Sequence, residues 1–308
     1  MSFILKAEKL SKWYGNILGI SEISIEIIPG IYGLLGPNGA GKSTFLKIAS
    51  GQLKPNLGSI KIFGEDVFNN YKLFSKVGFC AEHDSYYKEV SGWEFMLFSA
   101  KCHGFKGKEA EQAVEFALNK VGLVEDKSKL ISAYSLGMRQ KLKLGLSIIH
   151  NPEFLILDEP LKGIDPIWRV KIIEMIKEFK NQGKTIIVSS HILSEVEAMT
   201  NNIILIHQGK IFAQGDIQEI RDLIDSHPHK ISVKCNKHRL IADKMINYDF
   251  VLNIQFKDKE NEVIINTDNR ENFFASLMKI VVDNNIDIQE ITSPDDNLQA
   301  VFDYLIGR

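Results

Sequence analysis

The segment 36–44 restricts the fold of this chain more than any other, because it reads Gly-Pro-Asn-Gly-Ala-Gly-Lys-Ser-Thr and fits the pattern G-x-x-x-x-G-K-[ST]. Its glycines, among them Gly39 and Gly41, let the backbone turn so that successive N–H groups point inward and form a nest for an anion. The apolar residues 31–35 before it predict a buried strand, and residues 42–50 after it predict a helix. This strand–loop–helix order predicts a phosphate loop over the positive end of a helix rather than an ordinary glycine turn.

Residues in and before this loop have distinct expected roles. Lys42 is expected to reach the outer phosphates of a nucleotide, and the Ser43 hydroxyl is expected to ligate Mg²⁺. Tyr14 is expected either to stack on the base or to pack as a strand aromatic. The full set of expected nucleotide-binding residues is Tyr14, Gly36, Pro37, Asn38, Gly39, Ala40, Gly41, Lys42, Ser43 and Thr44.

Composition limits the remaining function classes. The 308 residues suggest two domains, and a formal net charge of −2 gives no global basic field for nucleic acid or anionic lipid. No apolar run approaches 18 residues and no signal peptide is expected, so a membrane role would need a partner. Cys80, Cys102 and Cys235 lie far apart, which predicts neither zinc nor disulfides but small buried residues in a reducing compartment.

The first part of the chain divides into regions of different texture. Short apolar runs within residues 3–28 and 59–63 predict small strands, and residues 84–130 read as largely helical. Ser91-Gly-Trp-Glu94 has the pattern of a capping box, and the helix behind it carries Phe95, Met96, Phe98 and Ser99. That apolar surface is expected to be core or the seat of a partner, with core favoured. Residues 139–224 alternate helix and strand, as in an α/β sheet with helices on both faces.

A second, smaller domain is expected after residue 229. Its elements follow the order β-α-β-β-α-β of a split βαβ module, with a closing helix at 298–306. The expected fold class is therefore α/β: a P-loop NTPase core with an N-terminal antiparallel β subdomain and a helical subdomain, plus a small C-terminal α+β domain. The expected boundaries are a cassette over 1–224 with its helical subdomain at about 84–150, a linker over 225–229 and an accessory domain over 230–308.

Four further features follow the phosphate loop in a fixed order. They are Tyr134-Ser-Leu-Gly-Met138 before a helix, Asp158-Glu159 at the end of an apolar strand, Gly163-Ile-Asp-Pro166, and His191 after the next buried strand. With these features in this order, the chain resembles the ATP-binding-cassette ATPases over about its first 220 residues. The resemblance implies ATP and Mg²⁺ as cofactors.

The acidic pair and the histidine have a readable chemistry. Asp158 can hold Mg²⁺ together with Ser43, and Glu159 beside it can deprotonate the attacking water. Alone, such an acidic pair would be read as a helix start, and a lone histidine after a strand as structural. Behind the phosphate loop, Glu159, His191 and Lys42 are the expected catalytic groups, with His191 on the γ-phosphate.

The resemblance assigns the segment 134–138 to the family's signature. Ser135 and Gly137 occupy its phosphate-facing positions at a helix N-terminus, accompanied by Leu136 and Met138. In proteins of this family the signature meets the nucleotide of the opposite subunit, so that two cassettes enclose two ATP molecules head to tail. Asp165 resembles the aspartate that communicates between the paired sites.

Several residues depart from the family pattern. Tyr134, Leu136 and Met138 replace three residues of Leu-Ser-Gly-Gly-Gln, and Leu161-Lys162 replaces smaller polar residues before Gly163. The glutamine expected after strand 77–80 is Glu82, which can approach Mg²⁺ but adds negative charge beside the phosphates. Sequences of this type look most like ATPases of exporters of peptide antibiotics, drugs or lipids.

The expected function is the ATPase subunit of an exporter. It would pair with a second cassette, lie at the cytoplasmic face of the membrane and drive a separate transmembrane permease through the groove near Glu82 and residues 84–130. The alternative is a soluble ABC ATPase acting on nucleic acid or ribosomes, but no long heptad coiled coil separates loop and signature, and no nucleic acid partner is expected. A small-molecule kinase would leave Ser135, Asp165 and His191 unexplained.

Overall fold

The computed structural model describes residues 3–84, 86–87, 89–217, 229–257 and 261–293. Within it the chain divides into two compact units, with the division between Asp216 and Ile217. Most of the expected 225–229 linker and the whole of the expected closing helix 298–306 lie outside the described residues. The exact linker boundaries therefore stay a prediction.

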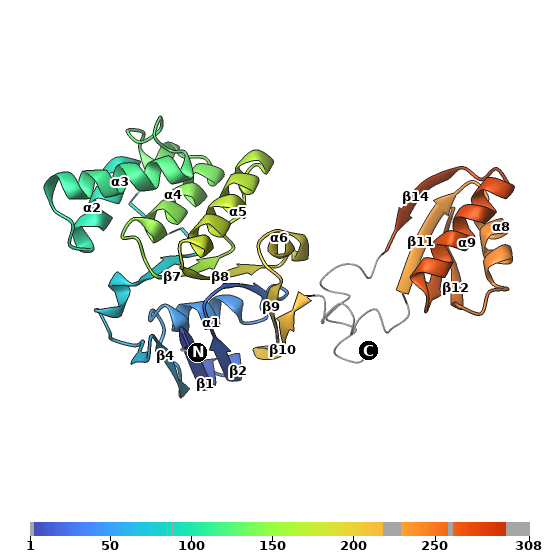
Figure 1. The fold of residues 1–308 in the computed structure, drawn as a ribbon, viewed down its shortest axis with the longest axis horizontal. Helices are drawn as coiled ribbons and strands as arrows, with labels where there is room; N and C mark the ends of the chain where they lie inside the picture. Colours follow the sequence, from blue (N-terminus) through green and yellow to red (C-terminus); the bar gives the residue numbers. More distant parts are fainter. Residues whose placement is uncertain (1–2, 85, 88, 218–228, 258–260, 294–308) are drawn as a thin grey trace. The chain divides into compact units, whose positions relative to one another are not determined.

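The chain begins with a four-stranded antiparallel sheet, as expected for the N-terminal β subdomain (Figure 1). Its strands, in the order β2-β1-β4-β5, are β1 (Leu5–Tyr14), β2 (Ile17–Ile27), β4 (Leu57–Ile62) and β5 (Glu65–Asp66). Buried and exposed residues alternate along parts of β1 and β2, so this sheet buries one face against the rest of the unit.

The second sheet has six strands in the order β10-β9-β3-β8-β7-β6. Its strands are β3 (Ile31–Leu35), β6 (Val77–Cys80), β7 (Phe154–Asp158), β8 (Thr185–Ser190), β9 (Asn202–His207) and β10 (Lys210–Asp216). All neighbours pair in parallel except β10, which runs antiparallel to β9. The carboxyl ends of five strands therefore meet at one edge, which is where open α/β sheets bind ligands.

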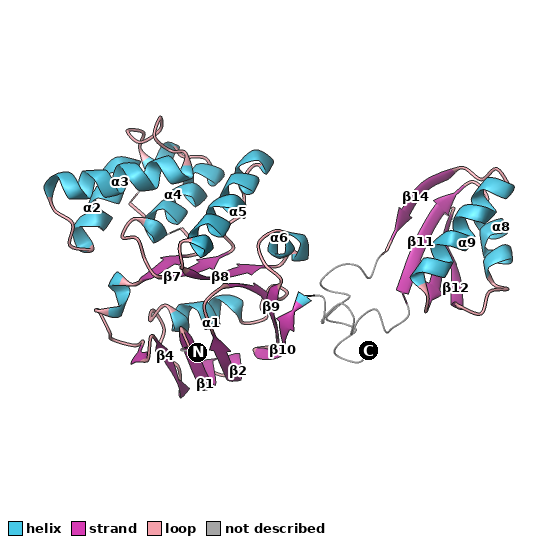
Figure 2. Cartoon of the chain, viewed as in Figure 1, coloured by secondary structure: helices cyan, strands magenta, loops and turns pink. Residues whose placement is uncertain are grey.

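Helices cover both faces of the six-stranded sheet, as the alternating pattern predicted (Figure 2). On one face lies α1 (Lys42–Ala49); on the other lie α4 (Leu136–Ile148) and α5 (Pro166–Asn181), with α2 (Gly92–Cys102) and α3 (Gly107–Val121) packed on α4. Alternate residues of β7 enter different cores: Phe154 packs with the α1 side, and Leu155 packs with the α4 side. This two-sided burial explains why β3 and β7 are apolar runs without alternation.

Local sequence signals fix several helix ends. The Ser91 side chain accepts a hydrogen bond from Glu94 N at 3.2 Å while the Glu94 carboxylate accepts one from Ser91 N at 2.8 Å, so the expected capping box is confirmed. Helix α4 starts at Leu136, because the Ser135 side chain caps it. The short α6 (Leu193–Glu197) follows β8.

The C-terminal unit has a core of its own. Its elements are β11 (His229–Cys235), α8 (His238–Met245), β12 (Val251–Lys257), β13 (Glu262–Thr267), α9 (Arg270–Asp283) and β14 (Ile288–Thr292). The strands form an antiparallel sheet in the order β12-β13-β11-β14, which is the expected β-α-β-β-α-β arrangement. Phe273 and Leu277 of α9 pack with Ile231 and Val233 of β11.

The apolar surface of helix α2 is partly buried in the core and partly exposed. Met96 is fully buried in the core, whereas 59% of the surface of Phe98 is exposed. Cys80 and Cys235 are buried as expected, but the expectation was wrong for Cys102, which ends α2 at the surface. Within the described residues, every helix is too short or too polar to cross a bilayer.

Substitutions at Met96 and Phe98 of α2 should have very different effects on stability. Met96→Ala should lower the free energy of unfolding by about 2–5 kcal/mol, because it leaves a cavity in the helical core. Phe98→Ala should change it by less than about 1 kcal/mol, because the ring is already largely in water. Urea unfolding followed by tryptophan fluorescence measures both, and equal losses would contradict the division of α2 into a core face and a free face.

Candidate functional site

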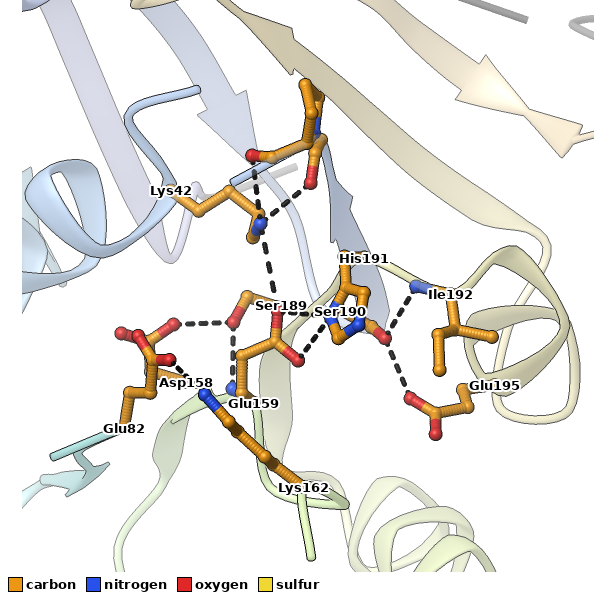
Figure 3. A network of polar contacts seen from close by, with 12 residues as sticks. Lys42, Glu82, Asp158, Glu159, Lys162, Ser189, Ser190, His191, Ile192 and Glu195 are labelled. Carbon is orange, nitrogen blue, oxygen red and sulfur yellow. Dashed lines mark hydrogen bonds and ion pairs between the residues drawn. The ribbon is translucent and has the colours of Figure 1, made fainter. Parts of the chain in front are cut away.

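The predicted site residues meet at the carboxyl edge of the parallel strands. The phosphate loop follows β3, His191 follows β8, the Asp158–Glu159 pair ends β7, and Glu82 follows β6. Since β3, β8, β7 and β6 are successive neighbours in the sheet, these side chains form one cluster (Figure 3). Strand pairing thus brings the phosphate loop together with site residues that lie more than a hundred positions later in the sequence.

The phosphate loop has the backbone that its glycines predicted. Gly39 and Gly41 have φ angles of 80° and 106°, and Gly41 directly precedes α1. A Cβ atom on Gly36 would lie 2.3 Å from the carbonyl oxygen of Ile206, so only glycine fits there. The loop encloses a pocket of about 290 Å³, which is lined by Tyr14, Ile17, Leu18, Gly19, Pro37, Asn38, Gly39, Ala40, Gly41, Lys42, Ser43, Thr44, Glu82 and Glu159.

Tyr14 lies at the rim of this pocket. It ends β1, is 45% exposed, and its hydroxyl lies 3.4 Å from Oγ1 of Thr44. It is therefore not packed within a strand core, and part of its ring is exposed at the rim. Ile17, Leu18 and Gly19 share this rim and were missed by the sequence analysis, which gave no motif for them; their only signal was their closeness to Tyr14.

Lys42 is folded into the site and is only 6% exposed. Its Nζ donates to the carbonyl oxygens of Gly36 at 2.7 Å and Pro37 at 3.3 Å, and it lies 3.7 Å from Oε1 of Glu159. Two buried side chains of opposite charge thus compensate each other within the pocket. The arrangement keeps a cation at the spot where phosphate oxygens would arrive.

Asp158 and Glu159 are both organised by Ser189, a residue of β8 that the sequence analysis did not select. The Ser189 hydroxyl donates to Oδ1 of Asp158 at 2.6 Å and accepts a hydrogen bond from the backbone N–H of Glu159 at 2.9 Å. All three residues are buried. A polar residue at the end of a buried strand was the available sequence signal.

The second oxygen of Asp158 marks where a cation could be held. Asp158 is 1% exposed, and among the described residues its Oδ2 has no hydrogen-bond partner. A buried carboxylate oxygen in that state costs free energy unless a ligand or water satisfies it. Asp158 is therefore a residue that could hold a divalent cation.

Glu159 is held in a costly backbone conformation with φ of 50°. Its carbonyl oxygen accepts a hydrogen bond from Nε2 of Gln140 at 3.1 Å, and its carboxylate oxygens lie 3.0 and 3.1 Å from Nδ1 of His191. These contacts hold both the backbone and the carboxylate of Glu159 in place, and this is how a strained conformation persists at functional sites. Gln140 was another residue that the sequence analysis did not select.

Glu82 reaches the pocket from the segment after β6. Its carboxylate accepts a hydrogen bond from Nζ of Lys162 at 2.8 Å, and its carbonyl oxygen accepts one from Nζ of Lys143 at 2.6 Å. The bond from Lys162 holds the pKa of Glu82 below its ordinary value, and the same contact raises the pKa of Lys162. Glu82 is therefore ionised at neutral pH.

The signature residues do not line the pocket of their own chain. The Ser135 hydroxyl accepts a hydrogen bond from Met138 N at 3.2 Å at the start of α4, and Leu136 is 55% exposed. A Cβ atom on Gly137 would lie 3.1 Å from the carbonyl oxygen of Gly163. Asp165 caps α5 through a hydrogen bond from Trp168 N at 3.0 Å.

A glycine-nest loop, a buried lysine and an acidic pair at neighbouring carboxyl ends of parallel strands define a P-loop nucleoside triphosphatase. Comparison with known proteins narrows this class. Residues 20–162 match the ABC transporter family. The chain is 33% identical to the bacitracin transport ATP-binding protein BcrA of Bacillus licheniformis, over all of this chain and 98% of that protein.

Two further comparisons agree. The linearmycin resistance ATP-binding protein LnrL of Bacillus subtilis (strain 168) is 30% identical over 99% of each chain. A solved ATP-binding subunit of an ABC transporter, 27% identical, covers 72% of this chain and 93% of its own length with a TM-score of 0.66. The chain therefore belongs to the ABC transporter family, and it is a subunit of the kind that binds and hydrolyses ATP. The resemblance inferred from the motifs is confirmed.

The contacts of Ser189 predict a kinetic effect without a binding effect. Ser189→Ala should lower kcat for ATP about tenfold, because it releases both the Asp158 carboxylate and the Glu159 backbone, while KM should stay within about twofold. Steady-state ATPase assays measure both constants. Ser189→Thr keeps the hydroxyl and should restore most of kcat, and Ser75→Ala, at an exposed hydroxyl, serves as the control. An unchanged kcat in Ser189→Ala would show that Ser189 positions neither group.

Proposed function

We propose that two copies of this chain close around two molecules of Mg·ATP and that this closure drives a separate transmembrane permease that exports its cargo. The observation that carries the proposal is the division of the site: the phosphate loop and Glu159 share one pocket, while the signature residues of the same chain do not line it. A head-to-tail pair supplies each pocket with the missing signature.

Nucleotide binding follows from the pocket. The N–H groups of the phosphate loop and the buried Lys42 would hold the phosphates, and Tyr14 at the rim would stack on the base. The 13-residue helix α4 would bring its positive end and the Ser135 hydroxyl to the partner's phosphates. Two anion-binding helix ends would thus meet on one nucleotide.

Magnesium fits the residues present. Mg²⁺ is usually held by one or two carboxylates together with substrate phosphates, and Asp158 offers a buried oxygen without a partner. No group of three or more His, Cys, Asp and Glu residues within the described chain could hold a metal by itself, which suits an ion that arrives with the nucleotide. When bound, the ion neutralises charge on the phosphates. Ser43 would be its second protein ligand, and Glu82 also lies within the pocket.

Hydrolysis is assigned to Glu159 as general base and His191 as the group that orients water and the γ-phosphate. In the structure Glu159 is held by Lys42 and His191 at the same time. Phosphate oxygens compete for the Lys42 ammonium, which frees the carboxylate to accept a proton from the attacking water. His191 is 44% exposed on its side chain and can follow the carboxylate toward the nucleotide.

Permease docking is assigned to an apolar groove beside β6. Its volume is about 460 Å³, and it lies between α2, α4 and the strand that leads to Glu82. Its lining includes Phe79, Phe95, Phe98, Cys102 and Leu146. We call it the α2 groove. Because β6 runs from this groove to Glu82, a permease seated there would be connected to the phosphate pocket.

The relatives support the proposed direction of transport and the proposed location. Proteins named for bacitracin transport and linearmycin resistance match the whole length of this chain. Removal of such compounds from the cell requires an ATPase on the cytoplasmic face of the membrane. An exported amphiphilic antibiotic or lipid is therefore the proposed class of cargo.

The base assignment predicts a trapped dimer. Glu159→Gln should bind ATP, hydrolyse it at least about a hundredfold more slowly, and accumulate as an ATP-bound dimer, because the amide cannot accept the proton. ATPase assays and size-exclusion chromatography with light scattering measure these effects. Adding Ser135→Trp should return this variant to a monomer that still binds ATP. Hydrolysis at the normal rate in Glu159→Gln would remove Glu159 as the base.

If the permease docks in the α2 groove, a substitution there should lower the affinity for the permease without changing the isolated chain. Phe98→Ala should weaken binding of the permease about tenfold, because an exposed aromatic ring that a partner covers is a typical interface hot spot. ATPase activity of the isolated chain should stay within about twofold. Phe116→Ala on α3, exposed but outside the groove, is the matched control. Equal affinity of the purified permease for both variants would place docking elsewhere.

A further inference from the structure

The family pattern leaves one chemical problem at the pocket. Glu82 places a carboxylate where a neutral amide is usual, and the pocket lining already contains the carboxylate of Glu159 but only one ammonium, that of Lys42. Lys42 lies 3.7 Å from Glu159, so its charge is engaged there. A triphosphate entering this pocket would meet Glu82 as an uncompensated negative charge unless another cation pairs with it.

Lys162 supplies that cation from outside the pocket. Its Nζ lies 2.8 Å from Oε1 of Glu82, while Lys162 itself is not among the residues that line the pocket. Only 24% of the Glu82 side chain is exposed, against 57% for Lys162. The carboxylate is therefore the more buried member of the pair, and the ammonium beside it is in partial contact with solvent (Figure 3).

The pair also joins two segments that carry site residues. Lys162 N donates to the carbonyl oxygen of Glu159 at 3.2 Å, so the turn that holds Lys162 is continuous with the proposed base. The next residue, Gly163, lies against Gly137 of the signature. On the other side, Glu82 belongs to the segment after β6. A single ion pair thus connects the Glu82 segment to the turn between Glu159 and Asp165.

We propose that Lys162 is the charge-compensating and positioning partner of Glu82, which makes a carboxylate at that place compatible with nucleotide phosphates. The two departures from the family pattern, at 82 and at 162, are then one paired substitution. This inference rests on the proposed nucleotide pocket but not on the permease, the cargo or the assignment of the base.

The interaction predicts an asymmetric pair of effects on nucleotide affinity. Lys162→Met should weaken binding of a fluorescent ATP analogue, measured in EDTA without divalent metal, by about fivefold, because it exposes the Glu82 charge to the phosphates. In the Glu82→Gln background, the same change should alter affinity by less than about twofold. The coupling should shrink as salt rises, because Lys162 is half exposed.

Two controls separate this role from general effects of charge or folding. Lys162→Arg keeps the cation and should bind within about twofold of wild type. Lys120→Met removes a lysine from another ion pair, with Glu178 at 2.7 Å, and should leave affinity unchanged because that pair lies on α3 and α5 away from the pocket. The measurement uses the full chain and needs no hydrolysis.

Failure of the Lys162–Glu82 inference can be told apart from failure of the nucleotide-pocket assignment. Suppose that wild type binds the analogue and that Lys162→Met lowers the affinity equally with Glu82 or with Gln at position 82. Lys162 then does not act through Glu82, and the inference is overturned while the pocket assignment stands. If Lys162→Met binds as wild type does, the same conclusion follows. If wild type binds no nucleotide either in EDTA or with Mg²⁺ added, the pocket assignment and the inference fall together.

Discussion

The pairing of β8 between β3 and β7 is the constraint on which the site depends. In this register Leu35 pairs with Ser190, and Asp158 pairs with Ser189. A slip of one residue would turn Ser189 to the opposite face of the sheet and separate it from both acidic groups. The apolar strands on both sides of this pairing are buried, so their packing fixes the register and with it the spacing between the phosphate loop, the acidic pair and His191.

The charged groups of the pocket are held by one another in the structure. Lys42 is bound to the carbonyl oxygens of its own loop and to Glu159, and Glu159 is bound to His191. Buried charges of this kind are tolerable only when paired, and a ligand that offers better partners rearranges them. In the proposed mechanism, nucleotide binding and release of Glu159 are therefore aspects of one exchange of ion pairs, in which the phosphates take over Lys42.

The sequence predicted the parts of the site that depend on local pattern. The phosphate loop, the acidic pair and His191 each stand at the end of an apolar strand, and the strand order of an α/β sheet then brings them together. Ser189 and Gln140 were missed because their role appears only when distant elements are neighbours. The burial of Met96 beside the exposure of Phe98 was likewise undecided, because a helical face does not reveal how far the neighbouring helices extend.

The central claim is that each active site is shared between two chains, and mixing two inactive variants tests it directly. Lys42→Ala disables the phosphate loop, and Ser135→Trp blocks the signature. In a head-to-tail dimer of one chain of each kind, one of the two sites contains both intact halves. A mixture should therefore recover ATPase activity of up to about a quarter of wild type. A mixture no more active than the mean of the two variants would contradict a shared site.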